Sequence, residues 1–164
     1  GQRGWREALR QAGAFVRVVR YGVGHAVDHG AAHPRAATDL HIGQDDGTLA
    51  AARACVGPGR LVGRSTHSLA QARAALADGF DYIGFGPLFP TPTKAGRPSI
   101  GLAEVAAMER EVGVTIPAFC IGGVKRANLP EVIAAGARRV VIVSDLLTAP
   151  DVAQAARKAK AMLP

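Results

Sequence analysis

The stretch that decides the fold is Asp81–Lys94, with the sequence DYIGFGPLFPTPTK. Its first part, Asp81–Phe85, is mostly apolar and aromatic and predicts a short strand. The residues that follow form a loop stiffened by glycine and proline, which carries two threonine hydroxyls and the ammonium group of Lys94. A strand that leads into small residues, hydroxyls and a cation is typical of an anion-binding loop at the carboxyl end of a strand.

On both sides of this stretch the chain alternates between predicted strands and predicted helices from residue 39 onward. The other strands are expected at Leu40–Gly43, Arg60–Arg64, Pro117–Ile121 and Arg139–Val143. Helices are expected at Thr48–Cys55, Leu69–Asp78, Leu102–Val112, Leu129–Ala135 and Asp151–Met162. Apolar strands that alternate with helices indicate a parallel sheet buried on both faces.

Polar residues or glycines follow the carboxyl end of every one of these strands. They are Asp46, Ser65, Thr91, Thr93, Lys94, Gly122, Gly123 and Ser144. A (β/α) barrel places its chemistry along this rim and often binds phosphate at its last two loops. A doubly wound sheet instead binds its ligand at one switch point. We therefore predict an α/β fold of the TIM-barrel type, with five C-terminal strand–helix units.

Size and composition limit the classes of protein that fit. The chain has 164 residues, 48% of them hydrophobic, and a formal net charge of +7. We expect one globular domain, no membrane span and no signal peptide. The positive charge favours an anionic partner, but the aromatic residues do not alternate with the basic ones, so we expect no nucleic-acid binding. Cys55 and Cys120 lack the spacing of metal ligands and suggest reduced thiols in the cytoplasm.

Three groups of residues are candidates for chemistry, and each has a structural alternative. Thr91–Lys94, Gly123 and Ser144 suit phosphate oxygens, or belong to ordinary loops and turns. Asp46, in the Asp45–Asp46 pair, suits Mg²⁺ bound together with substrate phosphate, or caps the next helix. His67 is either a general acid/base or a hydrogen-bonded loop histidine. The residues form no clear nucleophile–base set.

Five motifs in order resemble thiamine-phosphate synthase. They are HIGQDD (41–46), GRSTHS (63–68), GFGP through TPTK (84–94), IGGV (121–124) and Val143–Ser144. The resemblance covers residues 39–164 and implies a TIM barrel. It also implies an Mg²⁺-dependent transferase that joins hydroxymethylpyrimidine diphosphate to a thiazole phosphate and releases pyrophosphate.

The resemblance also implies a role for each site residue. Asp46 matches a Mg²⁺ ligand, while Ser65 and Lys94 match residues that hold the diphosphate. Thr91, Thr93, Gly123, Val143 and Ser144 match the site for the thiazole phosphate. The reaction is largely dissociative and needs charge stabilisation of the leaving group more than a protein base.

Residues 1–38 depart from the family and are predicted to be an atypical N-terminal segment before a partial barrel. The family's Gln-x-Arg-x-Lys and Asn-Asp motifs, which precede the strand at Leu40, have no counterpart here. Low activity is therefore expected from this chain on its own. The alternatives are a thiazole tautomerase-like isomerase that uses His67, or a non-catalytic fragment that binds a phosphorylated ligand. The sequence leaves open a homo-oligomer.

Overall fold

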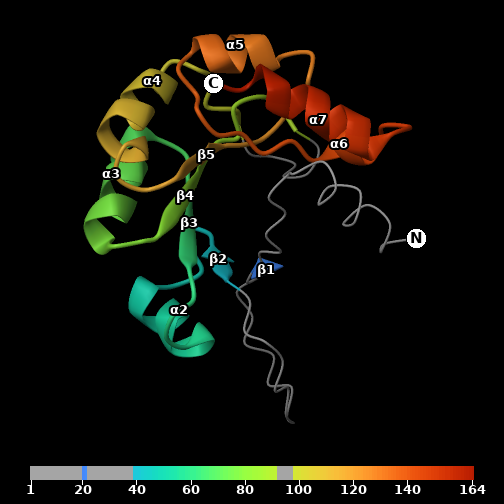
Figure 1. Ribbon diagram of the computed structural model, residues 1–164. Helices are drawn as coiled ribbons and strands as arrows, with labels where there is room; N and C mark the ends of the chain where they lie inside the picture. Colours follow the sequence, from blue (N-terminus) through green and yellow to red (C-terminus); the bar gives the residue numbers. More distant parts are fainter. Residues whose placement is uncertain (1–19, 22–38, 92–97) are drawn as a thin grey trace.

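The computed structural model describes residues 20–21, 39–91 and 98–164. Its centre is a parallel sheet of five strands that follow one another in chain order (Figure 1). The strands are β1 (Arg20–Tyr21), β2 (Leu40–Ile42), β3 (Val62–Thr66), β4 (Tyr82–Phe85) and β5 (Ala118–Cys120). β1 pairs with the outer side of β2, with Arg20 opposite Leu40. A parallel sheet in chain order with helical connections is the expected arrangement of a (β/α) barrel.

Helices connect these strands and follow the last of them. They are α2 (Leu49–Val56), α3 (Leu69–Asp78), α4 (Val105–Met108), the π-helical turn η2 (Glu109–Gly113), α5 (Leu129–Ala134), α6 (Ser144–Leu147) and α7 (Val152–Met162). In Figure 1, α2, α3 and α4 lie along one side of the sheet, and α5, α6 and α7 gather beyond β5. Within the described ranges, none of these helices has the length and apolar character needed to cross a membrane.

Local signals in the sequence fix the helix ends. Ser68 caps α3 by accepting a hydrogen bond from the amide of Gln71, and Gly79 ends it in the left-handed conformation with φ 87°. Thr48 caps α2 and Asp151 caps α7 in the same way, each through its side-chain oxygen. These caps confirm the predicted position of α3 and bring α2 and α7 within one residue of their predicted bounds.

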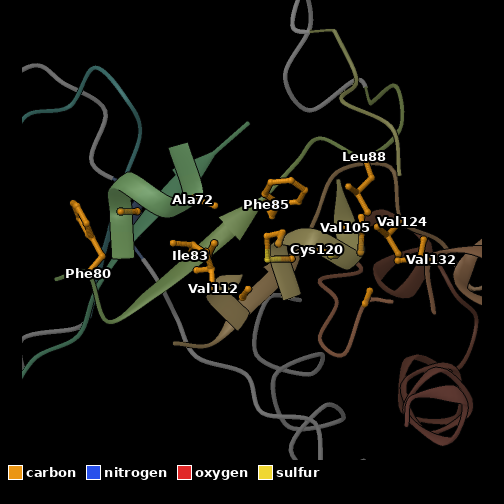
Figure 2. Packing of buried hydrophobic residues seen from close by; sticks show 14 of the residues in the cluster. Ala72, Phe80, Ile83, Phe85, Leu88, Val105, Val112, Cys120, Val124 and Val132 are labelled. Carbon is orange, nitrogen blue, oxygen red and sulfur yellow. The ribbon is translucent and has the colours of Figure 1, made fainter. Parts of the chain in front are cut away.

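The two faces of the sheet differ in character. The face towards the helices carries Ile83, Phe85 and Cys120, which have no exposed surface and pack with residues of the surrounding helices (Figure 2). The opposite, inner face carries Tyr82, Gly84 and Phe119, which are only half-buried. Apolar burial stabilises the fold on the helix side, and the inner face is available for other roles.

One predicted strand and the boundaries of two other elements were wrong. Arg139–Val143 does not form a strand: the described structure gives it one isolated bridge, between Val140 and Cys120. The helix predicted over Leu102–Val112 starts only at Val105 and becomes π-helical at Glu109. The strand predicted over Arg60–Arg64 is shifted to Val62–Thr66, which places Ser65 inside the strand. Within residues 1–38, the structure describes only the short strand Arg20–Tyr21.

The two cysteines differ in environment, and this difference predicts their reactivity. Cys120 is fully buried, and burial together with the nearby charge of Glu109 raises the pKa of its thiol to about 12. Cys55 is exposed on α2. At pH 8, we expect an aromatic disulfide reagent to modify one thiol per native chain rapidly and the second only after unfolding. Equal rates for both thiols in the native protein would contradict this assignment.

The raised pKa of the Cys120 thiol makes the stability of the fold depend on pH in the alkaline range. The thiol of Cys120 stays protonated in the folded chain while an exposed thiol begins to ionise at its ordinary pKa of 9.0. The stability contributed by this neutral thiol is therefore complete below pH 9 and is lost as the pH rises towards 12.

Candidate active site

Ser65, a predicted site residue, lies near the carboxyl end of β3. It is 7% exposed, and its hydroxyl is hydrogen-bonded to Nε2 of His41, at 3.0 Å, from the neighbouring strand β2. Its carbonyl oxygen accepts a hydrogen bond of 2.5 Å from the side chain of Gln44. The hydroxyl is thus held in one orientation at the edge of the inner face.

A turn after β2 presents Asp46 near the same end of the sheet. One oxygen of its carboxylate accepts a hydrogen bond of 2.7 Å from the amide of Gly43, and the side chain is otherwise exposed. Asp45 beside it is also exposed. The hydrogen bond from Gly43 holds the Asp46 side chain, and the exposed carboxylate is accessible to a cation from solvent.

Arg64, the residue before Ser65, holds this turn from the other face of the sheet. Its guanidinium donates to the carbonyl of Gly47 at 2.9 Å and to the carbonyl of Gln44 at 3.0 Å. β3 therefore contacts the turn through two successive residues, Arg64 and Ser65.

His67 follows β3 directly and is held by two hydrogen bonds. Its Nδ1 donates to the carbonyl of Gly86, and its backbone amide donates to the side chain of Gln71 at 2.8 Å. Since a carbonyl can only accept, the proton of the neutral ring lies on Nδ1. These bonds fit a structural loop histidine, and a role as acid/base stays a prediction.

The loop after β5 packs against the start of the loop after β4. The amide of Leu88 donates to the carbonyl of Ile121 at 2.9 Å, and the amide of Phe89 donates to the carbonyl of Gly122 at 3.0 Å. Gly123 has φ 67°, and a Cβ there would lie 2.7 Å from the Cβ of Phe89. Only glycine fits this close approach. Gly123 therefore lies beside the segment that leads to Thr91.

Val143 and Ser144 lie at the start of the short helix α6, and both are exposed. An ion pair fixes this helix to the loop after β5: Nε of Arg126 lies 2.8 Å from a carboxylate oxygen of Asp145. The hydrogen bond from Arg126 holds the pKa of Asp145 below its usual range. The Gly123 loop and the start of α6 are thus linked, as a shared phosphate site would require.

Thr91 is half-buried at the end of the described part of the loop after β4. Thr93 and Lys94 lie in residues 92–97, outside the described residues. Their predicted roles therefore remain predictions.

Four further residues at this site were not predicted from the sequence: His41, Gln44, Tyr82 and Phe119. The rings of His41 and Tyr82 have centroids 5.4 Å apart, and Tyr82 meets Phe119 edge-on at 6.1 Å. Gly63 leaves room for this row, because a Cβ there would lie 2.2 Å from the Tyr82 ring. One sequence signal was available: His41 is a polar residue between the apolar Leu40 and Ile42. The row gives the inner face an aromatic surface beside Ser65.

Known proteins match this chain in sequence and in fold. The family model for thiamine monophosphate synthase matches residues 9–146, beginning well before residue 39. A thiamine-phosphate synthase of Acidothermus cellulolyticus is 43% identical over 162 residues, covering 96% of this chain and 76% of the relative. One from Mycobacterium sp. (strain KMS) is 51% identical over 124 residues, covering 74% of this chain and 53% of the relative.

Among solved structures, thiamine phosphate pyrophosphorylase from Pyrococcus furiosus has a TM-score of 0.64 and 29% identity. The match covers 75% of this chain and 57% of that structure. The chain spans about half the length of the mycobacterial relatives that it matches. The predicted boundary at residue 39 remains a prediction.

Proposed function

From the premise that this chain belongs to the thiamine monophosphate synthase family, we propose that it takes part in thiamine biosynthesis by binding the two phosphorylated substrates of thiamine-phosphate synthesis. These are hydroxymethylpyrimidine diphosphate and a thiazole phosphate. In the overall reaction the bond between the pyrimidine methylene and the diphosphate oxygen breaks, and the thiazole nitrogen bonds to that carbon. Pyrophosphate leaves. A cytoplasmic location suits these substrates and two cysteines that form no disulfide.

One observation supports this proposal most: Ser65 near the end of β3, the Asp46 turn after β2 and the Gly123 loop after β5 share one edge of one sheet, and an ion pair links the Gly123 loop to the start of α6. We assign the diphosphate to Ser65 and Lys94, and the thiazole phosphate to Thr91, Thr93, Gly123, Val143 and Ser144. The half-buried rings of Tyr82 and Phe119 offer a surface on which a flat pyrimidine can stack.

We also assign Mg²⁺ to Asp46. The described residues contain no group of three or more His, Cys, Asp or Glu side chains that could enclose a metal. The single carboxylate of Asp46 fits Mg²⁺, because proteins commonly hold this ion through one or two carboxylates together with substrate phosphate oxygens. When bound, the ion supplies positive charge to the departing diphosphate. The protein's own contribution is to hold Ser65 and the ammonium of Lys94 where that charge develops.

Binding of the thiazole phosphate tests the phosphate assignment. Replacing Thr91 by valine removes the hydroxyl but keeps the shape, and we expect it to weaken binding about tenfold, since a hydrogen bond to a charged group contributes roughly 1.5–3 kcal/mol. Titration calorimetry measures the effect. Thr115→Val is the matched control, because Thr115 is exposed and lies near the amino end of β5. Equal affinities for the two variants would contradict the assignment.

Turnover distinguishes the alternatives. Thiamine phosphate formed from both substrates and Mg²⁺, at a low rate, supports the proposed function. Isomerisation of a thiazole carboxylate phosphate that disappears in His67→Ala would instead support the tautomerase. Calorimetric binding of thiazole phosphate with no turnover of any kind would support a non-catalytic binding protein.

A further inference from the structure

Arg64 occupies a strand position where the fold favours an apolar residue. On the face of the sheet towards the helices, its neighbours in register are Ile42 on β2 and Ile83 on β4. Both isoleucines are buried, at 3% and 0% exposure. A charged side chain in such a row contributes less apolar burial than an isoleucine would. We therefore expect Arg64 to have another role in the protein.

We expect this role to be the hydrogen bonding of Arg64 to the acidic turn, residues 44–47. The two carbonyls that accept from its guanidinium belong to Gln44 and Gly47, which lie on either side of the Asp45–Asp46 pair. A guanidinium can donate to two acceptors at once from a rigid planar fork, which the single ammonium of lysine cannot reproduce. The turn is therefore held at both of its ends by one side chain.

The surroundings keep the guanidinium in place. Its central carbon lies 5.4 Å from the ring centroid of Phe80, which is 3% exposed. A cavity of about 310 Å³, lined among others by Thr48, Asp78 and Phe80, lies beside the turn and Arg64. The turn borders this cavity, and the two hydrogen bonds of Arg64 hold it there.

We propose that Arg64 is a positioning residue that fixes the carboxylate of Asp46 for the metal ion and couples it to Ser65. The inference rests on the proposed function, because it gives Asp46 a cation to bind. β3 holds the turn through two successive residues: Arg64 donates to the carbonyls of Gln44 and Gly47, and the carbonyl of Ser65 accepts from the side chain of Gln44. One strand thus sets the distance between the metal-binding carboxylate and the hydroxyl assigned to the diphosphate.

Electrostatics and positioning make opposite predictions for the loss of Arg64. Removing a positive charge near a cation site strengthens cation binding if charge alone matters. Loss of a residue that orients a metal ligand instead weakens binding, commonly by about 10–100-fold. The sign of the effect therefore separates the two roles in a variant that stays folded.

The test measures Mn²⁺ binding by electron paramagnetic resonance in the presence of inorganic pyrophosphate. We expect Arg64→Gln to bind Mn²⁺ about tenfold more weakly than the unchanged chain, and Arg64→Lys to lie between the two. The lysine variant keeps the charge and serves as the test if the glutamine variant does not fold. Arg53→Gln is the matched control: Arg53 also donates to two carbonyls, those of Arg60 and Gly79, but at the amino ends of β3 and β4.

Mn²⁺ affinity that is unchanged or tighter in both Arg64 variants would overturn the positioning role and leave the proposed function standing. The positioning role would also be wrong if Arg53→Gln weakened Mn²⁺ binding as much as Arg64→Gln. Absence of Mn²⁺ binding by the unchanged chain would overturn the metal assignment to Asp46 and, with it, the role of Arg64.

Discussion

Asp46→Asn is expected to weaken Mn²⁺ binding in the presence of pyrophosphate by at least about 100-fold, and to lower any thiamine-phosphate turnover to the same degree. Two unit charges 4 Å apart interact by about 4 kcal/mol at an effective dielectric constant of about 20, and about 1.4 kcal/mol is a tenfold change in affinity. A divalent ion in direct contact with the carboxylate exceeds this interaction. The exposure of Asp46 reduces it, which sets the expected effect near the lower bound.

The substitution isolates the charge from the shape of the turn. The amide of Gly43 donates to a side-chain oxygen of Asp46, and the amide oxygen of asparagine accepts the same bond. The turn is therefore expected to keep its conformation, and the melting temperature is expected to change little.

Asp45→Asn provides the matched control. It removes the same charge from a neighbour that is also exposed, and we expect it to change Mn²⁺ affinity less than about threefold, because a solvent-exposed charge that is not a ligand is strongly screened. Equal losses in the two variants would mean that the pair acts by its summed charge, and the assignment of the metal ligand to Asp46 would be wrong.

Helix ends were predictable from the sequence because their signals are local. Ser68 and Gly79 lie at the two ends of α3, and each acts on amides or carbonyls within four residues of itself. The same holds for Asp151 at the start of α7. The family and the parallel α/β fold were also predictable, since the motifs after each strand carry both.

The wrong predictions concern elements that depend on distant partners. Arg139–Val143 has the composition of a strand, but a strand needs hydrogen-bonding neighbours, and the described structure provides only the edge of β5 through Val140. The helix near Leu102 starts late because the amides of Ile100 and Gly101 donate back to Pro87 and Leu88, and the side chain of Glu104 accepts from the amide of Leu69. These contacts hold the chain in a loop where its composition favours a helix.

In the candidate site, too, local motifs were recognisable in the sequence and contacts between distant residues were not. Asp46, Ser65 and Gly123 were predicted as site residues from motifs and stay predictions, whereas their hydrogen-bonding partners were not predicted. His41 reaches Ser65, and Arg64 reaches the acidic turn, only because of the register between β2 and β3. Register is set by the packing of the whole sheet, so a single sequence does not reveal which side chains meet across it.

The difference between the two faces of the sheet leads to the second large effect, on stability. Phe85→Ala is expected to lower the free energy of unfolding by about 3–5 kcal/mol, because Phe85 is fully buried on the helix side and its loss leaves a cavity (Figure 2). A domain of this kind is commonly stable by only about 5–15 kcal/mol. The variant is therefore expected to be only marginally stable at 25 °C. Urea titrations followed by circular dichroism measure this as a lower midpoint of unfolding.

Phe119→Ala is the matched substitution, since Phe119 lies on the adjacent strand β5 but points to the inner face. It is half-buried and meets Tyr82 edge-on, so its removal is expected to cost about 1–2 kcal/mol, from partial burial and one aromatic pair. Its larger effect is expected on ligands, as weaker binding of the pyrimidine diphosphate with unchanged binding of the thiazole phosphate. If Phe119→Ala destabilised the chain as much as Phe85→Ala, the inner face would be a second core and not a binding surface.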